Sequence, residues 1–462
     1  MTKILVWSID NFSISTFHST SLKPSQNQGG LTAQQAAQSR LQLLKKVLLA
    51  SQPDIFVVIE VTSGDNRLSD LATFTGGFDG CSFLLNYLRT ECNINAGDWR
   101  LVPPLKVGTG SKAESVGVFY RGTFEEGQRY FTGPNLWSGG ANGFSVEPTS
   151  EVTSGAYPGT APGVPNIRNF LVPSGEKPRT IPANALHNPG IPEDQVAVRH
   201  QFRENNDDNT AGDYLDFQGT REPYMVSFTE TNGTNVRNLT LFCIHAPDVS
   251  EYPDVFMTYL GETYDIVSPL KANETRLVCG NFNLNLLKSD GTDAESYQAL
   301  TEKDYRVLLT PAGEPPTDLD SYRGYFATQI KDSDNTAAST FLWSDEDDKA
   351  YYPAYGYINN GVENLYSVDN ILVYPFKDSP YDYKTTILNP VVGTPLDKVA
   401  SPSGDPPQGT IAMEHDFTNA EDWPPAPTAP TWSSGAAKNL ISWANYQHIK
   451  STSDHFALYA EV

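Results

Sequence analysis

The chain has 462 residues, of which 39% are hydrophobic and 11% aromatic, so it holds enough apolar material for a large folded core. This composition excludes global disorder. Its 55 acidic residues outnumber 32 basic ones and give a formal charge of −23, which excludes a polybasic nucleic-acid binder. Any contact with a phosphate backbone must therefore be local, or helped by a bound cation.

The first part of the chain predicts strands that alternate with helices. Residues 4–9 are apolar and rich in β-formers, and residues 33–50 carry leucines and valines at helical spacing. The run IFVVIEV, residues 55–61, predicts a strand that contains one carboxylate, Glu60. The next predicted elements are a helix over residues 82–90 and a strand over residues 115–120.

The later part continues the same alternation. Residues 225–228 and 239–245 predict a hairpin across the turn Asn232-Gly233. Residues 252–270 predict one helix, and the apolar start of RLVCGNFNLNLL, residues 276–287, predicts a strand after it. The last predicted strands cover residues 366–373 and 456–462.

Two regions, residues 133–216 and 381–432, break this alternation. Both are rich in glycine, proline, serine and asparagine, as in VTSGAYPGTAPGVPN and SPSGDPPQG. Such composition is typical of irregular loops or insertions. Alternation with paired strands elsewhere predicts an α/β sandwich with mixed sheets.

The four cysteines and the start of the chain bear on the compartment. Cys81, Cys92, Cys243 and Cys279 form no CxxC pair and no metal-finger spacing, so we expect buried free thiols. No stretch has the apolar length of a membrane span. MTKILVWSI begins directly as a strand, without the regions of a signal peptide. We therefore expect a cytoplasmic protein by default, and the alternative is a secreted protein whose signal has been removed.

Polar residues of the kind that a metal–phosphate site requires follow several predicted strands. A carboxylate, amide or histidine at one strand end is more often a solvated turn residue than a functional one. Finding such residues at so many strand ends, in this order, favours a common site. They are Asp10, Glu60, His245, Asn283, Asp369, Asp454 and His455.

These strand ends lie in stretches that resemble the endonuclease/exonuclease/phosphatase family, the fold of pancreatic-type deoxyribonuclease and exonuclease III. The stretches are WSIDNF, PDIFVVIEV, ESVGVFYR, TREPYMVSF, LTLFCIHAP, VCGNFNL, YSVDNILV and SDHFALYAEV. They run from Trp7 to Val462, and HAP together with ESVGVFYR is most similar to the deoxyribonuclease branch. The resemblance implies a four-layer α/β/β/α sandwich of two mixed β-sheets with helices outside. It also implies a single domain over residues 1–462, with insertions at about 133–216 and 381–432.

The resemblance further implies a divalent-cation site. A cation of this kind, Mg²⁺ or Mn²⁺, is bound by hard oxygen ligands while a phosphate oxygen completes its shell. The family pattern makes Glu60 the principal ligand, with Asp454 and Asp10 beside it.

The same pattern implies two carboxylate–histidine pairs that flank the phosphate. Glu114 pairs with His245, and Asp369 pairs with His455. In each pair the carboxylate fixes the tautomer and supports a charged imidazole. One imidazole then activates water or protonates the leaving oxygen, and the other stabilises negative charge on the phosphorane. Arg221 matches the arginine that contacts phosphate in the family; the alternative is a surface ion pair with Glu222 or another acid.

Two positions depart from the family. Ser8 follows Trp7 where the family has asparagine, so we assign Ser8, with Arg221, to the phosphate side of the site. Asn281 and Asn283 stand in Gly-Asn-Phe-Asn where the family has Gly-Asp-Phe-Asn, so Asn281 replaces a catalytic aspartate. An amide keeps the shape but cannot accept a proton and is a weaker ligand for Mg²⁺. Losing such a group costs about two to four powers of ten in rate, or roughly 3–5 kcal/mol of barrier.

Three explanations of Asn281 compete. The chain is a natural enzyme in which the pair Glu114–His245 dominates catalysis, or a pseudoenzyme that keeps the cleft to bind phosphates or a partner. The third is a deliberate isosteric inactivation, which leaves Ser8 unexplained. Long neutral drift conflicts with the joint presence of so many site residues. We therefore favour a metal-dependent phosphodiesterase, attenuated as written.

The resemblance favours DNA or RNA as the substrate. The stretch ENLYSVDNILV lacks the Pro-Ala-Trp-Cys-Asp-Arg run of the inositol-polyphosphate branch and the Leu-Asp-Tyr of the apurinic-site branch. No exposed apolar run predicts a lipid phosphodiesterase, although that activity and a phosphatase stay alternatives of the same fold. We expect Arg121 and Arg221, with a cation, to offset the acidic charge locally. The other alternative is a binding or structural protein that uses the insertions as a protein-binding surface.

Overall fold

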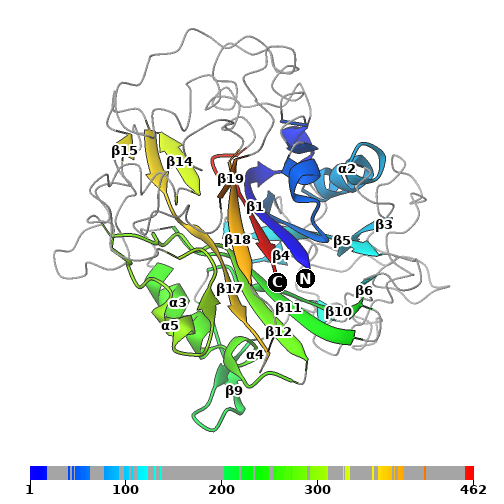
Figure 1. The fold of residues 1–462 in the computed structure, drawn as a ribbon. Helices are drawn as coiled ribbons and strands as arrows, with labels where there is room; N and C mark the ends of the chain where they lie inside the picture. Colours follow the sequence, from blue (N-terminus) through cyan, green and yellow to red (C-terminus); the bar gives the residue numbers. More distant parts are fainter. Residues whose placement is uncertain are drawn as a thin grey trace, which may run out of the picture.

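Both ends of the chain lie in one β-sheet of the computed structural model (Figure 1). The structure describes residues within 1–17, 40–62, 77–137, 202–310, 326–332, 356–389, 410–412 and 453–462, with shorter gaps inside several of these ranges. β1 (Lys3–Phe12) pairs antiparallel with β20 (Ala457–Glu461). Thr2 and Val462 exchange two backbone hydrogen bonds, of 2.6 and 2.9 Å, beside this pair. The chain ends are therefore joined inside the core.

The first sheet has the order β19-β18-β20-β1-β2-β5-β3, and β4 pairs with β5. β1 and β2 are parallel, as expected for strands joined by a crossover, and the described residues of 40–51 in that crossover are helical. β2 pairs antiparallel with β5, so the sheet is mixed. The remaining strands are β2 (Ile55–Thr62), β3 (Asp98–Val102), β4 (Lys106–Val107), β5 (Glu114–Gly122), β18 (Lys384–Asn389) and β19 (Thr410–Ala412).

The second sheet has the order β13-β17-β12-β11-β10-β6, and β7 pairs with β10. β11 and β12 are parallel, because α3 (Pro253–Glu262) and α4 (Tyr264–Val267) form the crossover between them. The other pairs are antiparallel. The strands are β6 (Tyr130–Phe131), β7 (Leu136–Trp137), β10 (Tyr224–Asn232), β11 (Asn235–His245), β12 (Glu274–Asn281), β13 (Arg306–Val307) and β17 (Asp369–Tyr374).

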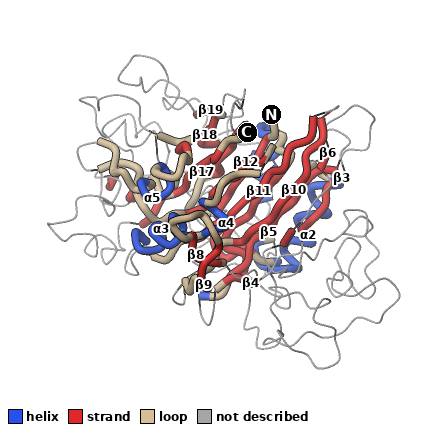
Figure 2. The backbone as a smooth tube through the Cα atoms, turned by 90° about the horizontal axis from the view of Figure 1, so that it is seen from below, coloured by secondary structure: helices blue, strands red, loops and turns tan. Residues whose placement is uncertain are grey.

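The two sheets pack face to face and helices cover their outer sides. The rings of Tyr120 on β5 and Phe228 on β10 lie 5.1 Å apart, which joins the sheets at their inner faces. α2 (Gly77–Thr90) lies on one side of the strands, and α3, α4 and α5 (Gln298–Thr301) lie on the other (Figure 2). The predicted four-layer α/β/β/α sandwich is therefore confirmed. No described helix is both long and apolar enough to cross a membrane.

Smaller elements extend this sandwich. β8 (Arg203–Asn205) and β9 (Ala211–Tyr214) form a hairpin, and η1 (Ile14–Thr16) follows β1. β14 (Gln329–Asp332), β15 (Gly356–Tyr357) and β16 (Glu363–Tyr366) form a separate three-stranded sheet.

Two predicted elements need correction. The helix expected over residues 252–270 breaks at Thr263, whose extended backbone forms a β-bridge with Glu204 and whose hydroxyl donates to Tyr259 O at 2.6 Å. The strand expected over residues 366–373 is interrupted at Ser367 and Val368, where Val368 N donates to Thr328 Oγ1 instead of a ladder partner.

The expected insertions also contain regular structure. The region 133–216 includes the hairpin β8–β9, and the region 381–432 includes β18, which pairs with β20 inside the first sheet. Thr385 and Thr386 in β18 are buried, although their composition resembles that of a loop. Composition alone therefore did not predict this core strand. The single-domain organisation over residues 1–462 stays a prediction.

The backbone of Gly280, just before Asn281, packs closely against the neighbouring strand of the second sheet. Gly280 has φ +137°, and a Cβ there would lie 2.1 Å from the carbonyl oxygen of Ile244 on the neighbouring strand. We expect Gly280→Ala to lower the free energy of unfolding by about 3 kcal/mol or more, because backbone must move to accept the methyl group.

Urea unfolding followed by tryptophan fluorescence measures this loss. The matched control is Gly212→Ala in the hairpin β8–β9, where the nearest atom is the movable side-chain oxygen of Asn206, at 2.7 Å from the added Cβ. We expect a change within about 1 kcal/mol for this control. Equal, small effects of both substitutions would contradict the description of Gly280.

Candidate functional site

The predicted site residues meet at one end of the two sheets. In the second sheet, His245 on β11, Asn281 on β12 and Asp369 on β17 are neighbours across consecutive ladders. From the first sheet, β2 contributes Glu60 at a break in register between Val58 and Val61, a β-bulge that turns its side chain. Strand ends far apart in the sequence thus contribute to one cluster of polar side chains.

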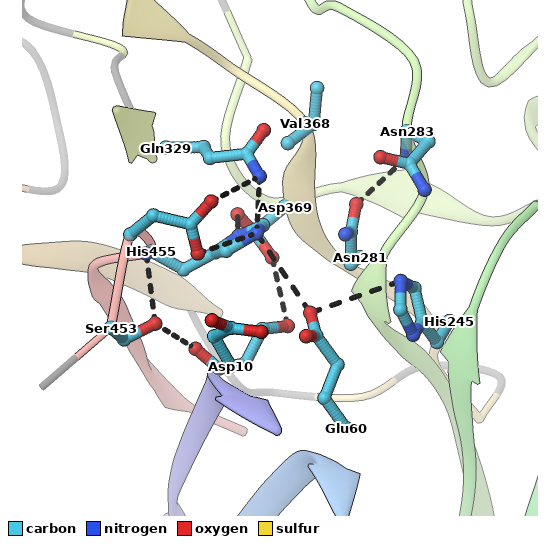
Figure 3. A network of polar contacts seen from close by, with 12 residues as sticks. Asp10, Glu60, His245, Asn281, Asn283, Gln329, Val368, Asp369, Ser453 and His455 are labelled. Atoms are coloured by element: carbon cyan, nitrogen blue, oxygen red, sulfur yellow. Dashed lines mark hydrogen bonds and ion pairs between the residues drawn. The ribbon is translucent and has the colours of Figure 1, made fainter. Parts of the chain in front are cut away.

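Glu60 lies between two imidazoles. Its Oε1 is 3.8 Å from Nε2 of His245 and 3.9 Å from Nε2 of His455 (Figure 3). Its backbone has φ +67°, a left-handed conformation that costs free energy in a residue with a side chain and that clusters at functional sites. Holding this carboxylate in place therefore costs the fold some free energy.

The first imidazole belongs to a chain of three charged groups. His245 Nδ1 lies 2.7 Å from Glu114 Oε2, and the guanidinium of Arg221 donates to Glu114 Oε1 at 2.5 Å. Burial acts to raise the pKa of Glu114, but His245 and Arg221 together hold this pKa below its usual value. Burial likewise acts to lower the pKa of His245, but the carboxylates of Glu114 and Glu60 outweigh it and raise this pKa.

The second imidazole has a matching carboxylate. His455 Nδ1 lies 2.6 Å from Asp369 Oδ2, and the hydroxyl of Ser8 donates to Asp369 Oδ1 at 3.3 Å. Burial opposes the charged imidazole, but Asp369 and Asp454 outweigh burial and raise the pKa of His455 to about 9. In both imidazoles, Nδ1 is thus hydrogen-bonded to a carboxylate and Nε2 faces Glu60.

Backbone contacts fix the second pair. The backbone N–H of His455 donates to Ser453 Oγ at 2.9 Å, and its carbonyl accepts from the indole of Trp7 at 2.9 Å. The N–H of Asp369 donates to Thr328 Oγ1 at 2.9 Å. Rigid supports of this kind keep catalytic groups in register.

Asn281 and Asn283 form a buried turn on the floor of the site. Asn281 Oδ1 accepts a hydrogen bond from the backbone N–H of Asn283 at 2.8 Å, and Asn283 Nδ2 donates to the carbonyl of Ala246 at 2.9 Å. An aspartate at 281 could accept the same bond through one oxygen and keep its second oxygen free. The amide therefore preserves the local structure and changes only the charge.

The roles predicted for Arg221, Ser8 and Asp10 stay predictions, but their contacts are now defined. The alternative was an ion pair with Glu222 or another acid, and the structure shows the ion pair with Glu114, whereas Glu222 accepts the backbone N–H of Gly108 at 2.8 Å. Ser8 is buried against Asp369, and the carboxylate of Asp10 accepts from the amide of Asn11.

The expectation that Arg121 offsets charge at the site needs correction. Its guanidinium forms an ion pair with Asp54, and its carbon Cζ lies 6.0 Å from the ring centre of Trp99. Arg121 is at the opposite end of β5 from Glu114, because the β2–β5 ladder pairs Ile55 with Tyr120 and Thr62 with Glu114. It therefore lies away from the two imidazoles.

Three further residues of the site had no role assigned from the sequence. Thr328 directly precedes β14 and Gln329 begins it, and Gln329 Nε2 lies 2.6 Å from His455 Nε2 and 3.1 Å from Asp454 Oδ2. Ser453 donates to the carbonyl of Ser8 as well as supporting His455. Thr328 and Gln329 lie in a stretch without a motif, and only the fold brings them to the site. Ser453 opens the stretch SDHFALYAEV, and its place directly before Asp454 and His455 was the signal that could have found it.

The electrostatics of Glu60 bear on whether the site fits a divalent cation. Burial, together with the carboxylates of Glu114 and Asp454, raises the pKa of Glu60 to about 7, although both imidazoles act to lower it. A cation beside Glu60 would remove this penalty, and carboxylate oxygens are the ligands that Mg²⁺ and Mn²⁺ prefer. In the described part of the chain, no three His, Cys, Asp or Glu side chains already converge on one metal-sized position. The carboxylate oxygens of Glu60 and Asp454 are the donor type that a hard cation takes, and binding of a cation there stays a prediction.

Comparisons with known proteins add only distant similarities. No protein-family model matches the chain. No curated protein matches it.

Among solved structures, an endonuclease/exonuclease/phosphatase family protein from Leptotrichia buccalis C-1013-b is 11% identical with a TM-score of 0.37, over 100% of this chain and 99% of that one. Beta toxin 275-280 from Staphylococcus aureus is 10% identical with a TM-score of 0.36, over 100% and 99%. Humanized D. rerio TDP2 is 10% identical with a TM-score of 0.32, over 99% and 97%. Similarity at this level assigns neither a substrate nor a mechanism, which must come from the site.

The raised pKa of Glu60 predicts a pH-dependent loss of stability in the metal-free protein. A carboxyl group whose pKa is about 7 when folded and near 4.5 when unfolded contributes stability below pH 4.5 that is lost as pH rises through 7. Glu60→Gln carries no charge, so we expect it to be more stable than the parent at pH 8 by about 1–3 kcal/mol, with little difference at pH 4.

Urea unfolding at a series of pH values with a chelator present measures the difference. Glu302→Gln, at an exposed carboxylate of the loop after α5, controls for loss of one negative charge far from the site. Adding Mg²⁺ should then stabilise the parent more than Glu60→Gln, since a ligand of the native state stabilises it. A parent-to-variant difference that is constant from pH 4 to pH 8 would contradict this account of Glu60.

Proposed function

We propose that the protein is a divalent-metal-dependent phosphodiester hydrolase acting on nucleic acid. One observation supports this most: two imidazoles, each with a carboxylate on Nδ1, turn Nε2 toward the same carboxylate, Glu60, at 3.8 and 3.9 Å. Two such imidazoles on either side of a half-buried carboxylate can act on opposite sides of one small anion. A phosphodiester has the size and charge for this position, and its hydrolysis needs one proton donor and one proton acceptor.

The two imidazoles supply complementary chemistry. His245, held by Glu114, accepts a proton from water or returns it to the leaving oxygen, and Glu114 keeps the ring in one tautomer. His455, held by Asp369, donates a hydrogen bond to the developing negative charge of the phosphorane. When bound at Glu60 and Asp454, with Asp10 beside them, Mg²⁺ or Mn²⁺ would neutralise charge on the phosphate oxygens.

The acidic chain limits how a nucleic acid approaches. The net charge is −23, and Arg121 is paired with Asp54. Arg221 lies beside the first imidazole pair, but its guanidinium is already paired with Glu114. Binding of the phosphate backbone would then depend on the metal and on charged imidazoles, and it would weaken as salt increases.

A binding protein without turnover is the second candidate function, and Asn281 favours it. Asn281 is buried and its oxygen is used by the N–H of Asn283, so this side chain cannot accept a proton. In such a protein the metal and phosphate would bind without cleavage. A phosphatase or a lipid phosphodiesterase would use the same imidazole pairs on another phosphate ester.

Restoring a carboxylate at position 281 separates the two candidates. We expect the parent chain to nick supercoiled plasmid DNA weakly or not at all with Mg²⁺ or Mn²⁺. Asn281→Asp should raise the rate at least about a hundredfold, because it supplies a free oxygen that accepts a proton or binds the cation.

The matched control is Asn285→Asp, two residues beyond Asn283, whose side-chain oxygen accepts the N–H of Ser367 at 3.1 Å. This variant adds the same charge in the same stretch but outside the imidazole cluster, and we expect no gain in nicking. If folded Asn281→Asp stays inactive, or if both variants gain equally, the hydrolase proposal fails and the binding protein takes its place.

A further inference from the structure

The two imidazoles of the site differ in what occupies their inward-facing nitrogens. Nε2 of His245 lies 3.8 Å from Glu60, and within the described residues no hydrogen bond reaches it. Nε2 of His455 instead lies 2.6 Å from the amide nitrogen of Gln329. Because Asp369 already takes Nδ1 of His455, Nε2 is the only atom through which this imidazole can bind a ligand. Gln329 therefore occupies the position that a bound phosphate oxygen would need.

The backbone of Gln329 is held in place, so only its side chain can yield. Gln329 forms a β-bridge with His455, and the N–H of Phe456 donates to the carbonyl of Thr328 at 2.7 Å. The hydroxyl of Thr328 accepts the N–H groups of both Val368 and Asp369, at 3.0 and 2.9 Å. Movement of the strand itself would break all of these bonds, whereas rotation of one side chain breaks none of them.

The side chain of Gln329 is incompletely satisfied where it lies. Its nitrogen donates to Asp454 Oδ2 and lies 2.6 Å from Nε2 of His455, where a charged imidazole presents a second donor. Its oxygen is buried and has no hydrogen-bond partner among the described residues. Figure 3 shows the nitrogen turned toward His455 and the oxygen turned away. A buried acceptor without a partner carries a desolvation cost. The contact with His455 is thus one that a stronger partner can replace.

We propose that Gln329 is a displaceable positioning residue: it holds Nε2 of His455 in the absence of ligand, and an anionic phosphate oxygen takes its place. The inference rests on the function proposed above, since it names the contact that a phosphate ester must break. A phosphate oxygen is the stronger partner, because it accepts a charge-assisted hydrogen bond from the Nε2–H of the imidazolium, whereas the amide nitrogen of Gln329 is itself a donor and cannot accept it. A neutral ligand of the same size lacks this advantage, so Gln329 also selects for anions.

Binding of inorganic phosphate, measured calorimetrically with Mg²⁺ present, tests the displacement. Gln329→Ala removes the competing contact, so we expect the Kd for phosphate to fall about threefold to tenfold. In a His455→Ala background the contact does not exist, and Gln329→Ala should then leave Kd unchanged. Gln298→Ala, at an exposed glutamine of α5, is the matched control and should also leave Kd unchanged.

Melting temperatures check that each variant is folded. If Gln329→Ala does not fold, Gln329→Met keeps the volume with a flexible side chain that has no N–H donor, and we expect the same tighter binding. A Kd that is unchanged or larger in the folded Gln329 variant, or an equal change in the His455→Ala background, overturns the displacement while phosphate binding by the parent still supports the hydrolase. If no variant and no parent chain binds phosphate, the proposed function fails, and the displacement fails with it.

Discussion

The structure depends on one electrostatic arrangement: a half-buried carboxylate, Glu60, surrounded by other carboxylates and balanced by two imidazoles. Glu60 repels Glu114 and Asp454, and the imidazoles of His245 and His455 lie within 4 Å of it on two sides. Desolvation alone would keep such a group neutral. The carboxylate beside each imidazole raises the pKa of that imidazole and so favours its charged form, which places positive charge on two sides of Glu60. Such an arrangement is costly for folding and suited to a cation or an anion that arrives later.

The rest of the fold holds this arrangement rigid. The bulge in β2 turns Glu60, the close approach at Gly280 places the asparagine turn beneath the imidazoles, and Thr328 bonds to the backbone before Asp369. The two chain ends pair in the first sheet, which brings His455 to the same edge as Glu60. Strain and burial are therefore concentrated where the chemistry is proposed, as is common where a site must be preorganised.

Much of this site could be predicted, because its main residues follow apolar strand runs that are readable from sequence. The pairs Glu114–His245 and Asp369–His455 were predicted from the family resemblance, and both form in the structure. What could not be predicted is the strand that brings Gln329 to His455, because the docking of a separate small sheet has no local sequence signal. The place of Arg121 was readable, since Glu114 and Arg121 flank the predicted strand 115–120 at opposite ends. The strand β18 was missed for a related reason, since its threonines resemble loop composition although they are buried.

Asn281 keeps the turn that an aspartate would form but lacks its charge. The remaining carboxylates around Glu60 would be stabilised by a bound cation. The most direct measurement is anomalous diffraction from crystals of the parent chain grown with Mn²⁺. We expect one strong anomalous peak within about 2.5 Å of a Glu60 oxygen, near Asp454 and between the two imidazoles. Manganese found only on the molecular surface, with Glu60 in contact with no metal in a well-ordered site, would contradict the account.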